Sequence, residues 1–224
     1  MKATGIVGEV RNILRDDEMK LEVCEIIHTE HDSDLLQKII VDLKETMRAN
    51  GCRYLTAPQI GEDYNVFCIR FGENDVRTFV NSMVKNVMHH HFSIEECLSI
   101  PGKRYLVQRC GTIVIECQTP LGESTEQTFY GEAAELIEHC IWHIDGNLIS
   151  MIGLEIDELW YQATDEEREE VMEAYKNALD EAAKIATQEL KDDPELAQLN
   201  EAIEFMNSVR DGKTKLEVIE DKSE

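Results

Sequence analysis

The sequence contains no apolar run that approaches the roughly 20 residues needed to cross a bilayer, so we expect no membrane-spanning helix. Residues 1–10 carry charge but no sustained apolar segment, and Glu9 and Asp16 come too early for a signal or transit peptide. These two absences favour a cytoplasmic protein. The length of 224 residues allows one buried core with an appendage, or two small domains.

Positive charge is scarce as well. The chain has 22 Lys and Arg against 46 Asp and Glu, and its formal net charge is -24. Nucleic acids and anionic membranes attract basic surfaces, so this balance argues against both as direct partners. The acidity is concentrated in residues 155–224, which hold 22 Asp and Glu against 8 Lys and Arg.

The seven cysteines include no Cys-x-x-Cys pair, and their number is odd. Without a secretory signal, this pattern argues against a disulfide framework. Most of the cysteines are expected to be buried thiols that pack as small hydrophobes. Cys97 and Cys140 are the two to consider as metal ligands.

The first two thirds of the chain mix helical and strand patterns. Apolar residues recur at helical spacing over residues 33–50, and a second helix begins at Gly131 and ends at Asp145-Gly146. Four strand-like runs lie between them, at residues 66–71, 78–80, 112–117 and 125–130. This order predicts an α+β fold with an antiparallel sheet.

The last third is helical in pattern. Thr164 and Glu167 form a capping box, and an apolar stripe continues from there to about Leu190. Asp193-Pro194 breaks the stripe, and a shorter helix is predicted over about residues 195–209.

The chain therefore divides into three parts: a domain over residues 1–155, an acidic helical extension over 156–210 and a charged, disordered tail over 211–224. The extension is either a docked layer with a solvated outer face or an arm that binds a partner.

Two histidines, His139 and His143, are spaced i, i+4 in the second helix. An α-helix turns about 100° per residue, so both imidazoles lie on one face and can hold one metal ion. Histidines also meet this spacing by coincidence on helix surfaces. In the H-E-x-x-H pattern of zinc hydrolases, a Glu that moves protons follows the first His, and here that residue is Cys140.

Two further segments lie upstream, at residues 56–61 (TAPQIG) and 95–102 (EECLSIPG). In this order and at these separations, the three segments resemble the motifs of the peptide deformylase family, roughly G-x-G-x-A-A-x-Q, E-G-C-L-S and H-E-x-x-H. The resemblance covers about residues 5–155. It implies an α+β domain with antiparallel sheets around a metal-carrying helix, to which this chain adds its C-terminal helical extension.

The resemblance implies one divalent metal ion held by Cys97, His139 and His143, with a fourth position left for water. A thiolate and two imidazoles suit Fe2+ or Zn2+, and Ni2+ or Co2+ are alternatives. Deformylases hold the oxyanion with a Gln side chain and the backbone N–H of the Leu after the ligand Cys, which match Gln59 and Leu98. Cys97 as an ordinary buried thiol and Gln59 as an ordinary polar loop residue remain alternatives.

The sequence also departs from the family's pattern at the proton-transfer position. Cys140 is a poor substitute for Glu, because a thiol has a pKa of about 8.5 and a shorter reach. Trp142 stands where the family commonly has Asp, and Glu96 replaces a Gly. Cys140 as a fourth metal ligand is an alternative that the divergence of adjacent helix side chains disfavours.

The peptide-binding positions differ too. Arg53 and Tyr54 align with the end of G-x-G, where glycines let the backbone approach the peptide. The family's methionine pocket is apolar, whereas the matching helix positions here are Glu132 and Glu135, with Glu95 nearby. Burying unpaired carboxylates beside a thioether is unfavourable. A slightly rotated helix that leaves both helix glutamates in water is the alternative.

We therefore predict a deformylase-like metallohydrolase acting on N-formylmethionyl peptides, including nascent chains at the ribosome, with weakened activity or altered specificity. The alternatives are a catalytically inactive homologue that binds peptide N-termini or a protein partner, and a structural zinc protein. The run at residues 89–91 (HHH) is predicted to be a strand-edge or loop cluster rather than a metal site.

Overall fold

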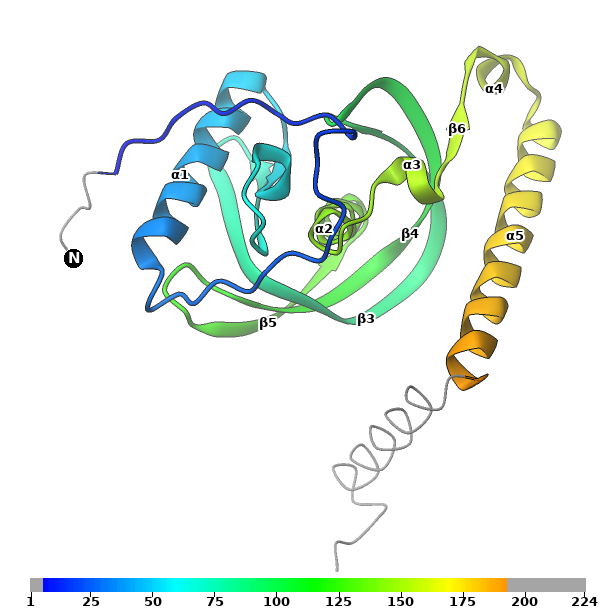
Figure 1. Ribbon diagram of the computed structural model, residues 1–224. Helices are drawn as coiled ribbons and strands as arrows, with labels where there is room; N and C mark the ends of the chain where they lie inside the picture. Colours follow the sequence, from blue (N-terminus) through cyan, green and yellow to red (C-terminus); the bar gives the residue numbers. More distant parts are fainter. Residues whose placement is uncertain (1–5, 193–224) are drawn as a thin grey trace, which may run out of the picture. The chain divides into compact units, whose positions relative to one another are not determined.

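The computed structural model describes residues 6–192. The chain divides into two units, Met1–Ala163 and Thr164–Glu224, which are described separately below (Figure 1). The elements of the larger unit are α1 (Ser33–Asn50), β1 (Tyr54–Thr56), the 3-10 turn η1 (Pro58–Ile60), β2 (Val66–Gly72), β3 (Asp75–Cys97), β4 (Ile100–Gln118), β5 (Ser124–Tyr130), α2 (Glu132–Ile144), α3 (Ile149–Ile152), β6 (Leu154–Ile156) and α4 (Glu158–Gln162).

The strands form one antiparallel sheet in the order β1-β2-β3-β4-β5, and β6 pairs with β4. Strands β3 and β4 are 23 and 19 residues long and pair from Val80–Gln118 to Cys97–Ile100. Register shifts interrupt this pairing at three places, and such bulges bend and twist a strand pair. The sheet curves around α2, which Figure 1 shows nearly end-on inside it. The predicted α+β fold is confirmed.

The predicted strand runs lie inside β2, β3, β4 and β5, but β3 and β4 continue well beyond them. Residues 85–96 were not predicted as strand because they are largely exposed and polar and carry the histidine run. Their partner residues in β4 are mostly buried, so the long hairpin owes its length to β4 and to packing that a local pattern does not contain.

Strand β2 separates two parts of the core. Successive side chains of a strand point to opposite faces, so Phe67 and Ile69 pack with α2, while Val66 and Cys68 pack with α1. Helix α1 begins and ends where the apolar spacing predicts, and Gly51 ends it in the left-handed conformation at φ 65°. The first four residues of β2 are apolar and buried on both faces, which fixes the sheet against α2.

Helix α2 has its apolar stripe against the sheet. Ile137, Cys140, Ile141 and Ile144 belong to a buried cluster that includes aromatic residues of β2, β3 and β5. Gly131, with φ 56°, precedes the helix, and Asp145 follows it, as the sequence predicts. The burial of this stripe fixes the rotation of α2 about its axis and so sets where its two histidines point.

The smaller unit contains α5 (Asp165–Asp192). The predicted capping box is present, because Thr164 Oγ1 accepts from the Glu167 backbone N–H at 3.2 Å and Glu167 Oε2 accepts from Thr164 N at 2.7 Å. The predicted helix at residues 195–209 and the tail at 211–224 lie outside the described residues.

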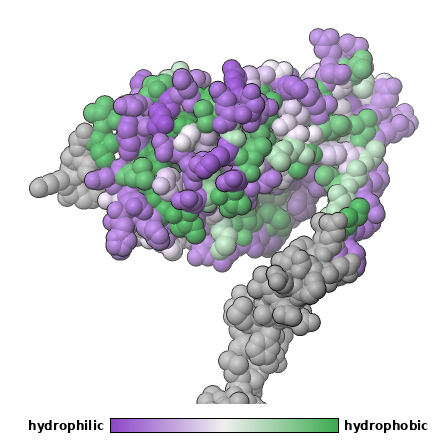
Figure 2. Space-filling model, viewed as in Figure 1, coloured by the Kyte–Doolittle hydropathy of each residue, from purple (hydrophilic) through white to green (hydrophobic). Residues whose placement is uncertain are grey.

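Within residues 6–192, no helix is long and apolar enough to cross a membrane. The visible face of the larger unit mixes hydrophilic and hydrophobic residues (Figure 2).

Candidate metal centre

Three ligand atoms from two distant segments converge beneath the end of the sheet. Cys97 lies at the last position of β3, and His139 and His143 lie one turn apart on α2. His143 Nε2 lies 3.3 Å from Cys97 Sγ and 3.1 Å from His139 Nε2, and the three ligand atoms are all within 4.8 Å of one another. All three side chains are buried.

The chemistry of this donor set fits a divalent cation. The Glu95 carboxylate accepts a hydrogen bond from His139 Nδ1 at 2.7 Å, which assigns the ring proton to Nδ1 and leaves the Nε2 lone pair facing His143. Burial, and then the nearby His139, hold the pKa of His143 well below its usual range, so this imidazole is neutral. A sulfur and two imidazole nitrogens at these separations either share protons in hydrogen bonds or surround a cation. Cys97, His139 and His143 are therefore a possible site for one metal ion.

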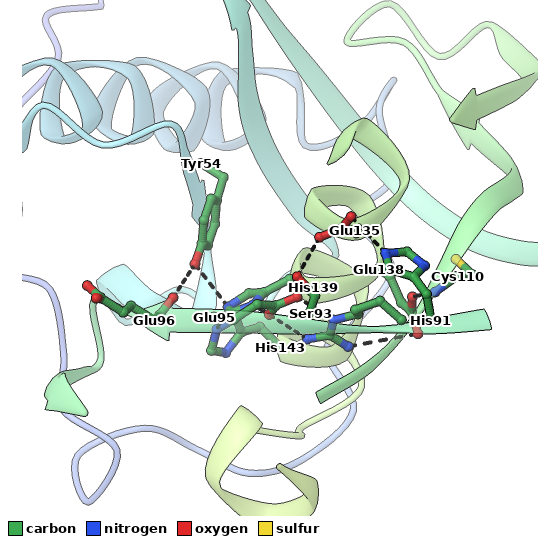
Figure 3. A network of polar contacts seen from close by, with 11 residues as sticks. Tyr54, His91, Ser93, Glu95, Glu96, Cys110, Glu135, Glu138, His139 and His143 are labelled. Carbon is green, nitrogen blue, oxygen red and sulfur yellow. Dashed lines mark hydrogen bonds and ion pairs between the residues drawn. The ribbon is translucent and has the colours of Figure 1, made fainter. Parts of the chain in front are cut away.

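A buried ion pair supports the first histidine (Figure 3). Arg109 donates to Glu95 through Nε at 2.7 Å and Nη2 at 2.9 Å, and its side chain is 0% exposed. Although burial alone would raise it, hydrogen bonds from Arg109 and His139 lower the pKa of the Glu95 carboxyl to about 2. Trp142, expected to remove a support, places its ring 4.4 Å from the Arg109 guanidinium and so covers the pair.

Sequence reasoning missed Arg109, which lies in β4 outside every motif. The available signal was an arginine within a strand whose neighbours, Val107 and Cys110, are apolar. Arginine is almost never fully buried without a partner, so this pattern indicates a buried carboxylate elsewhere in the fold.

Gln59 lies directly behind the sulfur. Its Nε2 donates to Ser99 Oγ at 3.2 Å and lies 3.8 Å from Cys97 Sγ, while its Oε1 accepts from the backbone N–H of Thr56 at 3.1 Å. The side chain is 0% exposed. Leu98, the second predicted oxyanion donor, follows Cys97 in the tight turn to β4. Both predicted residues thus lie next to the candidate metal ligand, Gln59 in space and Leu98 in the chain.

The Cys140 thiol does not join the three candidate ligands. Its side chain is 0% exposed and packs in the apolar cluster beneath the sheet, and burial raises the pKa of its thiol well above the usual value. Among the described residues, the converging ligand atoms are those of Cys97, His139 and His143, without Cys140. Glu138, on the other side of His139 in the chain, accepts from the Cys110 backbone N–H at 2.8 Å.

A cavity of about 730 Å³ opens beside His139. All five predicted pocket residues line it; they are Arg53, Tyr54, Glu95, Glu132 and Glu135. The sequence reasoning did not identify Ser93, Arg104 and Tyr161, which also line it. Neither Ser93, in the polar part of β3, nor Tyr161, in α4, lies in a motif that would have placed it there.

The charged groups of the cavity are mostly paired. Arg53 pairs with Glu132, and Arg104 pairs with Glu96 at 2.5 Å. Glu135 differs, because its carboxylate accepts from Ser93 Oγ at 2.7 Å and contacts His91 Nε2 at 3.0 Å. Its side chain is only 20% exposed, whereas that of Glu132 is 67% exposed. The predicted alternative of two glutamates in water therefore describes Glu132 better than Glu135.

Tyr54 reaches the candidate metal ligands from β1. Its hydroxyl donates to the backbone carbonyl of Glu96 at 3.0 Å and lies 3.2 Å from His139 Nε2. Its ring lies against the imidazole, with 4.8 Å between the ring centroids. In Figure 3 the phenol extends down from its strand with the hydroxyl directed at the His139 ring.

Comparisons with known proteins agree with this arrangement. The family model for polypeptide deformylase matches residues 10–152. A peptide deformylase of Dictyoglomus turgidum is 26% identical over 144 residues, covering 64% of this chain and 91% of that protein. The crystal structure of a peptide deformylase from Thermotoga maritima is 25% identical with a TM-score of 0.60, covering 64% of this chain and 97% of that one.

A third relative was solved with a peptide. The class I type b peptide deformylase from Acinetobacter baumannii, bound to Met-Ala-Ser, is 23% identical with a TM-score of 0.59 and covers 64% of this chain and 99% of its own. The matches of sequence and fold thus cover the unit that contains Cys97, His139 and His143. The chain belongs to the peptide deformylase family.

Proposed function

We propose that this chain is a metal-dependent hydrolase that releases formate from N-formylmethionyl peptides, with weakened activity or altered specificity. The observation that carries the proposal is the convergence of Cys97, His139 and His143 beside the 730 Å³ cavity. The Met-Ala-Ser complex of the Acinetobacter relative supports a peptide as the occupant of such a cavity. The proposal places the protein in the cytoplasm, where nascent chains at the ribosome carry N-formylmethionine, and names Fe2+ or Zn2+ as the metal.

Different residues would hold the metal ion, donate to the oxyanion and orient His139. Cys97, His139 and His143 would hold the metal ion, which would supply a Lewis acid that polarises the formyl carbonyl and lowers the pKa of a neighbouring water. Gln59 and the Leu98 backbone N–H are the proposed donors to the oxygen that becomes negative, because both adjoin Cys97. Glu95 holds the proton on His139 Nδ1 and keeps the opposite nitrogen free.

Proton transfer is the weak step. Cys140 is buried in the apolar cluster as a neutral thiol, and Glu138 is engaged with the Cys110 backbone. Neither group can accept a proton at the centre and return it to the leaving amine. Loss of a positioned general acid–base group lowers a rate by about 10²–10⁴, so turnover is expected to be slow.

The decisive experiment measures formate release from formyl-Met-Ala-Ser by the full chain loaded with zinc or iron under anaerobic conditions. Slow release is expected from the natural sequence, and a rise of about 10²-fold from Cys140→Glu. Cys140→Gln is the matched control, because it fills the same space without a carboxylate. The proposal fails if the metal-loaded natural sequence and Cys140→Glu both release no formate.

A second candidate function is a catalytically inactive homologue that binds peptide N-termini. The buried thiol at Cys140 and the phenol of Tyr54 beside His139 favour it. Its signature is binding of a formylated peptide, measured by calorimetry, without formate release from the same sample.

A further inference from the structure

The hydroxyl of Tyr54 faces the His139 nitrogen that also faces His143. His139 Nε2 lies 3.1 Å from His143 Nε2 and 3.2 Å from Tyr54 Oη. His143 Nε2 in turn lies 3.3 Å from Cys97 Sγ. Tyr54 Oη, His139 Nε2, His143 Nε2 and Cys97 Sγ therefore follow one another at three similar distances.

Ligand atoms that share one tetrahedral ion, at about 2.0–2.3 Å from it, lie roughly 3.3–3.6 Å from one another. The three observed separations are close to this range. Oxygen donors are common partners of nitrogen and sulfur at Zn2+. We propose that the Tyr54 hydroxyl oxygen is the fourth metal donor and closes the Cys97, His139 and His143 site.

The local fold holds the phenol in place. Tyr54 pairs with Ile69 in the sheet, and its neighbours Leu55 and Thr56 are 0% exposed, so β1 is anchored on both sides of the sheet. The His139 ring, tilted 58° to the phenol ring, contacts the side chain, and the Glu96 carbonyl accepts from its hydroxyl. Coordination requires no oxidant or reductant. The phenol either keeps its proton on the Glu96 carbonyl or releases it to solvent when the oxygen binds the cation.

This inference rests on the metal centre of the proposed function. It adds that the Tyr54 oxygen limits the access of water and substrate to the metal. The Tyr54 oxygen takes the position that a water or a formyl oxygen needs. The site then holds a metal firmly and exchanges its fourth ligand poorly. Tyr54 and Cys140 thus oppose turnover for different reasons. The Tyr54 oxygen occupies the fourth metal position, and the Cys140 thiol cannot transfer the proton.

The test uses the full chain loaded with Co2+, whose visible absorption reports the ligands, and azide as a probe anion. The natural sequence is expected to show little spectral change with azide. Tyr54→Phe keeps the ring and removes only the oxygen, so its cobalt spectrum is expected to differ and to shift on azide addition. Tyr161→Phe, which removes another hydroxyl from the same cavity, is the control and is expected to match the natural sequence.

Zinc affinity gives a second readout. Tyr54→Phe is expected to bind zinc at least about tenfold more weakly than Tyr161→Phe, because it loses a donor. The inference is overturned if the natural sequence takes up azide as readily as Tyr54→Phe. It is also overturned if azide leaves the cobalt spectrum of Tyr54→Phe unchanged and shifts only that of Tyr54→Gly. In that case the ring would block access to the metal sterically, and the hydroxyl would not be a ligand.

Failure of the proposed function looks different. In that case none of these variants releases formate, yet the cobalt spectra of the natural sequence and Tyr54→Phe still differ. Absence of stoichiometric cobalt binding by the natural sequence would reject the metal centre and both proposals together.

Discussion

Glu95 joins a buried cation to a candidate metal ligand. One carboxylate oxygen contacts Arg109 Nε, and the other contacts His139 Nδ1. The motif resemblance predicted that Glu95 would lie near the pocket, and it does line the cavity. Its link to Arg109 could not be predicted, because the two residues meet only when β3 pairs with β4 in one particular register. The location of Glu95 at the cavity was therefore predictable from the sequence, but its ion pair with Arg109 was not.

Replacing Glu95 tests this role in metal binding. Glu95→Gln weakens the hold on His139 and removes the carboxylate that accepts two hydrogen bonds from the buried Arg109, so zinc affinity is expected to fall about 10–100-fold. Competition with a chromogenic chelator measures the change. Glu96→Gln is the matched control, since its side chain is 63% exposed and pairs with Arg104 at the surface. Equal zinc affinities for the two variants would contradict the assigned role.

Glu135 is expected to select the first side chain of a bound peptide. It is a mostly buried carboxylate in the cavity whose partners are Ser93 and His91 rather than Arg or Lys. A cationic side chain can pair with it, whereas a methionine would remove water from it without replacing the hydrogen bonds. Calorimetry is expected to show that Lys-Ala-Ser binds about tenfold more tightly than Met-Ala-Ser, equivalent to about 1.4 kcal/mol.

Glu135→Ile is expected to reverse that order, while the exposed Glu169→Ile on α5 leaves it unchanged. If the natural sequence prefers Met-Ala-Ser by the same margin as Glu135→Ile, the carboxylate does not contribute to selection.

At the scale of elements, helices were easier to predict than strands. Helix α1 has a 3.6-residue stripe and a glycine end that are both local signals, and α2 has similar ones. Strand β3 runs for 23 residues, yet its second half is mostly exposed and shows no alternation. Its extended conformation depends on pairing with β4, a long-range effect.

Helix α1 also anchors the segment before it. The Asp42 carboxylate is 1% exposed and accepts from Lys38 Nζ at 2.8 Å, from the Glu9 backbone N–H at 2.8 Å and from Arg11 Nη1 at 3.1 Å. Burial opposes ionisation, but these hydrogen bonds lower the pKa of Asp42 below its ordinary value. Asp42→Asn is expected to lower the free energy of unfolding by about 2 kcal/mol at neutral pH.

The sign of the pH dependence follows from that lowered pKa. The stabilisation is fully present above the ordinary Asp pKa of 3.8 and is lost as pH falls through the lower folded-state pKa. Urea unfolding of the metal-free protein should therefore show a gap between Asp42→Asn and the natural sequence that shrinks below about pH 4. Glu45→Gln on the same helix removes a surface pair with Arg48 and is expected to change stability by at most about 0.5 kcal/mol. If the difference in free energy of unfolding stays constant with pH, the charge of Asp42 does not stabilise the fold.

At the scale of the whole molecule, the excess of acidic residues and the match to the deformylase family lie in different parts of the chain. The polypeptide deformylase match ends at residue 152, while residues 155–224 carry 22 of the 46 acidic residues. The larger unit ends at Ala163. It includes β6, which pairs with β4 through Arg104–Ile156, and α4, whose Tyr161 contacts Arg104 in the cavity wall. The sequence motifs identified the part that contains the candidate metal ligands, but the contribution of α4 to the cavity depends on this tertiary packing.

A fragment of residues 1–163 is therefore expected to fold and bind metal by itself. It contains the three buried clusters of the core and every residue that lines the 730 Å³ cavity. Cooperative thermal unfolding and stoichiometric zinc binding, within about twofold of the full-chain affinity, are the expected results. A shorter fragment ending at residue 152 is the matched comparison, because it lacks β6 and α4 and so removes Tyr161 from the cavity. If the two fragments bind zinc equally well, β6 and α4 do not contribute to the metal centre. If the 1–163 fragment unfolds without cooperativity or binds zinc far more weakly than the full chain, residues beyond 163 are needed to complete the fold, and the acidic part of the chain has a structural role in the metal centre.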